Sequence, residues 1–182
     1  MLSEGAAVEA WLDSLVHDVA DFPSPGVVFK DITPLLADAA AFAATVEAMA
    51  DLGRDVSGGH VDAVVGVEAR GFVFAAPVAL ALGTGFVPVR KAGKLPSQTY
   101  AVSYALEYGE ATLEVHRDAF GTGDRVLLVD DVLATGGTVE ATAQLVAQCG
   151  AEVAGVVVLL ELSFLGGAER LAGLPLAALR TL

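Results

Sequence analysis

The stretch Val126-Leu-Leu-Val-Asp-Asp-Val-Leu-Ala-Thr-Gly-Gly-Thr138 decides the fold, because it leads from an apolar run through a polar loop towards a helix. Residues 126–129 are all apolar and two of them are β-branched, which is typical of a strand buried on both faces of a parallel sheet. The apolar spacing predicts that the helix begins near Val139. In an open α/β sheet, ligands bind in the crevice where such a strand ends.

The loop contains residue types that suit a phosphate group. The two glycines within residues 135–138 let backbone N–H groups point inward, the two threonines add hydroxyls, and the helix adds the positive end of its dipole. The preceding Asp130 and Asp131 would repel phosphate but accept hydrogen bonds from vicinal hydroxyls. Neither a Walker loop nor a Rossmann fingerprint is present. The stretch therefore predicts a site for a phosphorylated sugar, and the alternative is an ordinary turn with surface acids.

Other segments supply the remaining elements of an α/β domain. The predicted core strands are 61–67, 86–90 and 153–162, and the predicted helices are 6–19, 34–53, 72–82 and 139–149. Residues 104–109 and 111–116 alternate like paired strands. The weakly patterned tail, residues 165–182, has no predicted role.

Length and composition favour a single α/β domain over residues 1–182. Residues 71–89 carry no charge, but prolines and glycines divide them, which argues against a membrane span. No basic region of the kind found in signal peptides opens the sequence. Cys149 is the single cysteine, so no intrachain disulfide is possible and a cytoplasmic location is expected.

The charge distribution points to an anionic ligand. A formal net charge of −13 argues against nucleic acid and anionic membranes as partners. The chain has only ten Lys and Arg residues, yet Arg90, Lys91 and Lys94 fall within five positions. In so acidic a chain this cluster predicts an anion site rather than a solvated surface.

Residues 126–138 resemble the phosphoribosyl pyrophosphate signature of the type I phosphoribosyltransferases. Four further segments, in the order in which that family has them, narrow the resemblance to the adenine phosphoribosyltransferases. They are Phe22-Pro-Ser-Pro-Gly-Val-Val-Phe-Lys-Asp-Ile-Thr-Pro34, Glu68-Ala-Arg-Gly-Phe72, Val89-Arg-Lys-Ala-Gly-Lys-Leu-Pro96 and Tyr104-Ala-Leu-Glu-Tyr-Gly109. Together the segments span about residues 22–165. The resemblance implies an open, mainly parallel sheet flanked by helices, with a small hood over the base site.

The resemblance also implies the reaction, in which adenine and phosphoribosyl pyrophosphate give AMP and pyrophosphate. Mg²⁺ is the implied cofactor, held mainly by phosphoribosyl pyrophosphate rather than by protein ligands, and a homodimer is the implied assembly. The implied phosphate and diphosphate contacts are Ala134, Thr135, Gly136, Gly137, Thr138, Arg90, Lys91 and Lys94. The implied catalytic residues are Glu107, Asp130 and Asp131.

A hood formed by residues 20–34 is expected to recognise the base. By resemblance, Phe29 stacks on adenine, Leu162 packs on its other side, and the backbone of Val28 and Lys30 reads its edge. A backbone carbonyl suits adenine because the exocyclic amine is a donor, whereas 6-oxopurines carry an acceptor there. The alternative is that this segment is a connecting loop.

Two further residues and a lid complete the implied site. Arg70 approaches the base in the family, and the alternative is a surface ion pair with Glu68. Glu107 matches a glutamate that bonds adenine, and the alternative is a solvated strand residue. Residues 95–109 resemble a lid that closes over the reaction.

Two rival functions are weighed against this one. A phosphoribosyltransferase for 6-oxopurines is expected to use a lysine after the phosphate loop, but the chain has no lysine after Lys94. A non-catalytic regulator that senses phosphoribosyl pyrophosphate usually carries a DNA-binding module, for which length and positive charge are both lacking here.

Overall fold

The structure, a computed structural model, describes residues 4–105 and 109–182 of the chain. The chain divides after Ala48 into two compact units, which are described in turn. Within the described ranges, no helix combines the length and the apolar character needed to cross a bilayer.

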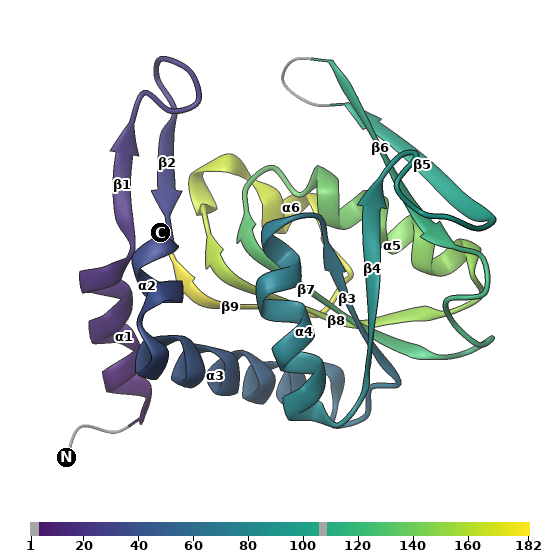
Figure 1. Cartoon of the computed structure of the whole chain (residues 1–182), viewed down its shortest axis with the longest axis horizontal. Helices are drawn as coiled ribbons and strands as arrows, with labels where there is room; N and C mark the ends of the chain where they lie inside the picture. The colour runs from purple at the N-terminus through teal and green to yellow at the C-terminus, as the bar shows by residue number, and fades with distance from the viewer. Residues whose placement is uncertain (1–3, 106–108) are drawn as a thin grey trace. The chain divides into compact units, whose positions relative to one another are not determined.

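The first unit contains helices and a β-hairpin. Helix α1 (Glu4–Leu15) precedes β1 (His17–Ala20), which pairs antiparallel with β2 (Val28–Asp31); α2 (Thr33–Ala37) and the start of α3 (Ala39–Ser57) follow. Figure 1 shows the two strands of the hairpin side by side. The helix predicted over 6–19 is therefore wrong beyond Leu15. Val19 pairs with Phe29 instead, and a β-branched residue suits that setting.

The predicted helix over 34–53 is interrupted at Asp38. Its carboxylate Oδ1 accepts hydrogen bonds from the backbone N–H groups of Ala40 and Ala41, at 3.0 and 2.9 Å. An aspartate in this role satisfies donors that the first turn of a helix leaves unpaired. Asp38 thus ends α2 and starts α3.

The second unit is built on a seven-stranded sheet of order β5-β6-β4-β3-β7-β8-β9. Its strands are β3 (Ala63–Val67), β4 (Gly85–Lys91), β5 (Thr99–Ala105), β6 (Glu110–His116), β7 (Arg125–Leu133), β8 (Glu152–Glu161) and β9 (Leu176–Thr181). Five neighbouring strands of the sheet run parallel to one another: β4, β3, β7, β8 and β9. Strands β5 and β6 pair with each other antiparallel, and β6 pairs antiparallel with β4. This arrangement confirms the predicted open, mainly parallel sheet. The predicted pairing of 104–109 with 111–116 holds where Tyr104 and Ala105 meet β6, but β5 begins five residues earlier than predicted, at Thr99, and residues 106–108 lie outside the described ranges.

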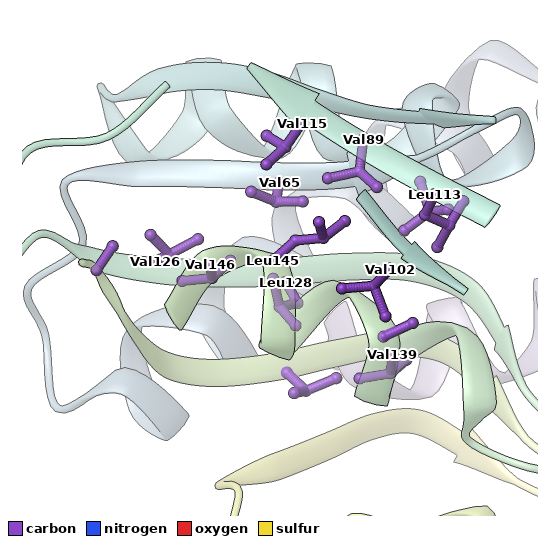
Figure 2. Close-up of a cluster of buried hydrophobic side chains, with 14 of the residues drawn as sticks. Val65, Val89, Val102, Leu113, Val115, Val126, Leu128, Val139, Leu145 and Val146 are labelled. Atoms are coloured by element: carbon purple, nitrogen blue, oxygen red, sulfur yellow. The ribbon is translucent and has the colours of Figure 1, made fainter. Parts of the chain in front are cut away.

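Helices cover both faces of this sheet (Figure 1). They include α4 (Arg70–Leu82) and α5 (Gly137–Gln148). Side chains alternate along a strand, so neighbouring residues of β3 face different helices. A Cβ on Gly66 would lie 2.6 Å from Cβ of Ala75 in α4, whereas Val65 belongs to the buried cluster that includes Leu145 of α5 (Figure 2).

The tail forms regular structure that the sequence did not reveal. A 3₁₀ turn η1 (Ser163–Leu165) and a short helix α6 (Gly167–Arg170) lead to β9, which pairs parallel with β8 at the edge of the sheet. Leu171, between α6 and β9, is buried in the core. The tail is therefore part of the folded unit.

Candidate active site

The two adjacent aspartates lie within strand β7. The apolar run 126–129 predicted this strand, which extends further in both directions, from Arg125 to Leu133, so the two aspartates lie towards its carboxyl end. Pairing with β8 extends the strand, because Asp130 lies opposite Val158 and Leu133 lies opposite Glu161. Asp131 is 5% exposed, and its backbone N–H donates a 2.9 Å hydrogen bond to the Asp130 carboxylate.

The polar loop after β7 runs directly into α5. Gly136 caps the helix with a left-handed φ of 81°, and the helix begins at Gly137, two residues earlier than predicted. The first N–H groups of a helix have no partner within it, and they carry the positive end of the dipole. A pocket of about 70 Å³ is lined by Asp130 and residues 132–139. This arrangement can hold a phosphate group.

The two glycines of the loop are closely surrounded. A Cβ on Gly136 would lie 2.9 Å from the carbonyl oxygen of Gly167 in the tail. A Cβ on Gly137 would lie 3.2 Å from Cδ2 of Tyr104. Larger side chains at these positions would displace the backbone of α6 or the ring of Tyr104, so the loop requires glycine for packing as well as for its turn.

A larger pocket, of about 240 Å³, lies beside the aspartates. It brings together five of the predicted site residues: Arg70, Lys91, Asp130, Asp131 and Thr138. Nε of Arg70 lies 2.8 Å from Oδ2 of Asp131. The predicted alternative, an ion pair between Arg70 and Glu68, is therefore wrong.

Glu68 instead binds the cationic cluster at the end of β4. Its carboxylate lies 3.2 Å from Nε of Arg90, accepts a 3.2 Å hydrogen bond from the backbone N–H of Lys91, and forms an ion pair with Nζ of Lys94. These contacts, with the Lys94 bond the largest cause, lower the pKa of Glu68 below its usual range. The peptide bond between Glu68 and Ala69 is cis.

The aspartate pair has the opposite electrostatic setting. Burial, followed by the charge of Asp131, raises the pKa of Asp130 well above its ordinary value. Two carboxylates in one strand thus favour a proton or a positive charge between them. A ligand that offers hydroxyl donors or a developing cation would satisfy both groups.

The remaining predicted residues lie elsewhere in the chain. Val28, Phe29 and Lys30 belong to the first unit, where the Phe29 ring packs edge-on against Phe22 and Nζ of Lys30 bonds Asp18 at 2.6 Å. Their roles stay predictions. Glu107 lies outside the described residues.

Leu162 follows β8, next to the end of β7. It is 8% exposed, and its backbone N–H bonds the carbonyl of Leu133 at 2.9 Å. The predicted position of Leu162 beside adenine also stays a prediction.

The contacts of two residues in this region were not predicted from the sequence. Tyr104 lines the larger pocket, and its hydroxyl lies 3.1 Å from Oγ1 of Thr138. Glu68 holds the cations, as described above. Both occur in the segments that carry the family resemblance, but their partners are 34 and at least 22 positions away, so sequence spacing gives no signal for either contact.

Comparison with known proteins identifies the class. The sequence model for the phosphoribosyl transferase domain matches residues 32–170, which is most of the chain. The chain belongs to the phosphoribosyl transferase family. The relatives and solved structures described next are adenine phosphoribosyltransferases, and the chain groups with them inside the family.

The adenine phosphoribosyltransferase of Nocardioides sp. is 66% identical over 92% of this chain and 91% of that protein. The crystal structure of the Thermoanaerobacter pseudethanolicus enzyme superimposes with a TM-score of 0.91 at 46% identity, covering 96% of this chain and 99% of that one. The Saccharomyces cerevisiae enzyme, solved with an imino-altritol bisphosphate and adenine, gives a TM-score of 0.91 at 36% identity with the same coverage. The fold and the family are thereby established over nearly the whole length.

Proposed function

We propose that this site transfers the 5-phosphoribosyl group of phosphoribosyl pyrophosphate to adenine, releasing pyrophosphate and forming AMP. One observation carries the proposal: the paired carboxylates, the phosphate-type loop and the cations converge at the ends of neighbouring parallel strands. A ligand with a phosphate, vicinal hydroxyls and a diphosphate matches these three groups.

Each part of the second unit then has a role. Residues 134–138 hold the 5-phosphate through backbone N–H groups and threonine hydroxyls, and Asp130 and Asp131 accept hydrogen bonds from the ribose hydroxyls. Arg90, Lys91 and Lys94 face the diphosphate, whose negative charge grows as the glycosidic bond breaks. The ribosyl group gains positive charge at the same moment, and the two aspartates stabilise it. Positioning and charge stabilisation supply the rate enhancement.

The residues that the family resemblance implies for the base keep those roles in this proposal. Phe29 and Leu162 stack on adenine, and the backbone of Val28 and Lys30 selects its amine. Arg70 approaches the base, and Glu107 bonds it and handles its proton. The resemblance of residues 22–34 and 104–109 to the adenine-binding segments of the family supports these roles.

Mg²⁺ fits this donor set as an ion carried by the substrate. In residues 4–105 and 109–182, no group of three or more His, Cys, Asp and Glu side chains could hold a metal by itself. The carboxylates of Glu68, Asp130 and Asp131 line the larger pocket; Glu68 is paired with Arg90 and Lys94, so the two aspartates are the ones that would approach such an ion. When bound, Mg²⁺ neutralises charge on the diphosphate.

We also infer a cytoplasmic homodimer. The lone Cys149 supports a reducing compartment, and the family resemblance supports two subunits, with Arg90 reaching towards the neighbour's site. Light scattering of the purified protein measures the assembly, and a monomer at micromolar concentration would contradict it.

Base specificity tests the function directly. Pyrophosphate release is measured at steady state with phosphoribosyl pyrophosphate, Mg²⁺ and one of four bases: adenine, hypoxanthine, guanine or xanthine. Adenine is expected to give the highest kcat/KM. A preference for an oxopurine would assign the chain to the rival class, and no release with any base would favour a binding protein.

The aspartate pair gives a residue-level test. Asp131→Asn keeps the shape but removes the charge that pairs with Arg70 and faces the ribose, so turnover is expected to fall by about a hundredfold. Glu152→Gln, which breaks an exposed ion pair with Arg125, is the matched control and should leave turnover unchanged. Turnover of Asp131→Asn equal to that of the control would remove the residue from the mechanism.

A further inference from the structure

Tyr104 connects the β5–β6 hairpin to the phosphate loop. It lies in β5, opposite Ala111 of β6. Its hydroxyl is 3.1 Å from Oγ1 of Thr138, and a Cβ on Gly137 would meet its ring at 3.2 and 3.6 Å. The ring therefore covers the first residue of α5, and the hydroxyl reaches the second.

The chemistry of two adjacent hydroxyls determines what this contact can do. Each hydroxyl has one hydrogen to donate and two lone pairs to accept with. If Thr138 donated to Tyr104, its single hydrogen would be used and could not reach a phosphate. If Tyr104 donates, the Thr138 hydrogen stays available for a phosphate oxygen, which accepts only. A chain of donors ending on an anion also strengthens each bond in it.

We propose that Tyr104 is a positioning residue that donates its hydroxyl hydrogen to Thr138 and thereby directs the Thr138 hydrogen to the 5-phosphate of phosphoribosyl pyrophosphate. This inference rests on the proposed 5-phosphate site at residues 134–138. Tyr104 acts through Thr138, so its removal changes the affinity for the sugar phosphate and leaves the affinity for adenine as it is.

The surroundings of Tyr104 support a specific role rather than packing alone. It is partly buried and lines the larger pocket with Asp131 and Thr138, so its hydroxyl lies where a ligand would exclude water. Ser103, the neighbouring residue in β5, also bonds a hydroxyl, that of Thr112 at 2.7 Å. That second pair is exposed, joins β5 to β6 rather than to α5, and lines neither the larger pocket nor the phosphate-loop pocket, so it provides a control for the loss of a hydroxyl pair on the same strand.

The test measures binding of ribose 5-phosphate by calorimetry to the wild type and to Tyr104→Phe, Thr138→Val, their double variant and Thr112→Val. Tyr104→Phe is expected to weaken binding about five- to tenfold, the value of one hydrogen bond in a chain that ends on a charge. Thr112→Val should bind like the wild type. Because Tyr104 acts through Thr138, the double variant should bind like Thr138→Val alone.

Kinetics and thermal melting give the second readout. In Tyr104→Phe, KM for phosphoribosyl pyrophosphate should rise by a similar factor while KM for adenine and the Tm stay unchanged. Loss of Tm with no change in either KM would show a packing role and overturn the proposal. Additive losses in the double variant would also overturn it, since Tyr104 would then contact the ligand independently.

Failure of the 5-phosphate site itself has a different signature. Thr138→Val would then bind ribose 5-phosphate as tightly as the wild type, whatever Tyr104→Phe does. If Thr138→Val binds weakly and Tyr104→Phe binds normally, the site stands and the role of Tyr104 is refuted.

Discussion

Two carboxylates of this site, Asp130 and Glu68, lie in opposite electrostatic environments. Asp130 shares a buried strand with Asp131, so ionising it is unfavourable, whereas Glu68 is surrounded by Arg90 and Lys94 and ionises readily. The pair of aspartates therefore attracts positive charge, whereas Glu68 holds the side chains of Arg90 and Lys94 near the ends of β3 and β4. A reaction that separates a cationic sugar from an anionic diphosphate suits this division.

The raised pKa of Asp130 predicts how its replacement changes stability with pH. The folded protein holds the Asp130 proton more tightly than the unfolded chain, whose carboxyl ionises near the ordinary value of 3.8. Stability from this group is therefore full below that value and is lost as pH rises through the raised pKa. Asp130→Asn should raise the Tm at pH 7, and the gain should vanish towards pH 4.

Asp62 is a control for this prediction, because its pKa is shifted in the opposite direction from that of Asp130. Its pKa is lowered, first of all because its carboxylate accepts the backbone N–H of Arg125, at 2.8 Å. It stabilises the fold above its unfolded pKa, so Asp62→Asn should lower the Tm at pH 7. Calorimetric scans at several pH values compare the two variants. A lower Tm for Asp130→Asn at pH 7 would contradict the buried-pair interpretation.

Chemically informative residues could be predicted from the sequence more readily than their partners. Residue type and position relative to an apolar strand identified Asp130, Asp131 and Thr138, which the pocket brings together. The contact of Arg70 with Asp131 was not predicted, and only the alternative for Arg70 named a partner, Glu68. Asp131 lies 61 positions further along the chain, and the turn that directs Arg70 towards it depends on tertiary structure. Spacing along the chain carries no record of such contacts.

At the scale of elements, the tail supports the phosphate loop. Helix α6 begins at Gly167, and a Cβ there would lie 2.3 Å from the carbonyl oxygen of Ala134 and 3.0 Å from Cγ of Leu133. Such close packing against backbone fixes the turn between β7 and α5. In addition, Nε and Nη2 of Arg170 each lie 2.7 Å from Oε2 of Glu140 in the first turn of α5.

The substitution Gly167→Ala, which adds one methyl group, tests whether the tail supports the phosphate loop. Gly167→Ala should force the loop and α6 apart, destabilise the protein by about 1–3 kcal/mol and weaken ribose 5-phosphate binding. Gly85→Ala is the control, because nothing lies within 4 Å of a Cβ at that position and its φ is ordinary. Thermal melting and calorimetry measure both effects. Unchanged ribose 5-phosphate binding in Gly167→Ala would show that the tail does not determine the loop's geometry.

The errors in the predicted elements have a common cause. The apolar spacing of residues 6–19 suited one helix, but pairing with β2 turned residues 17–20 into a strand. Strand β9 was not predicted because its residues become a strand only through pairing with β8. Long, strongly apolar runs such as β3 and β7 were predictable, since burial on both faces is recorded in their own composition.

For the whole molecule, the net charge of −13 contrasts with the local chemistry of the site. Three of the ten Lys and Arg residues, Arg90, Lys91 and Lys94, lie together at the end of β4, and the glycine loop leads into the N-terminus of α5. An acidic protein can thus bind a doubly phosphorylated sugar because the favourable groups are concentrated at one edge of one sheet.

The most direct test of this account is a crystal structure of the protein with bound AMP. The account predicts that the 5-phosphate oxygens lie within hydrogen-bonding distance, about 2.7–3.2 Å, of the backbone N–H groups of residues 135–138, with the ribose hydroxyls on Asp130 and Asp131. A 5-phosphate bound instead at Arg90 and Lys94, or anywhere else away from that loop, would contradict it.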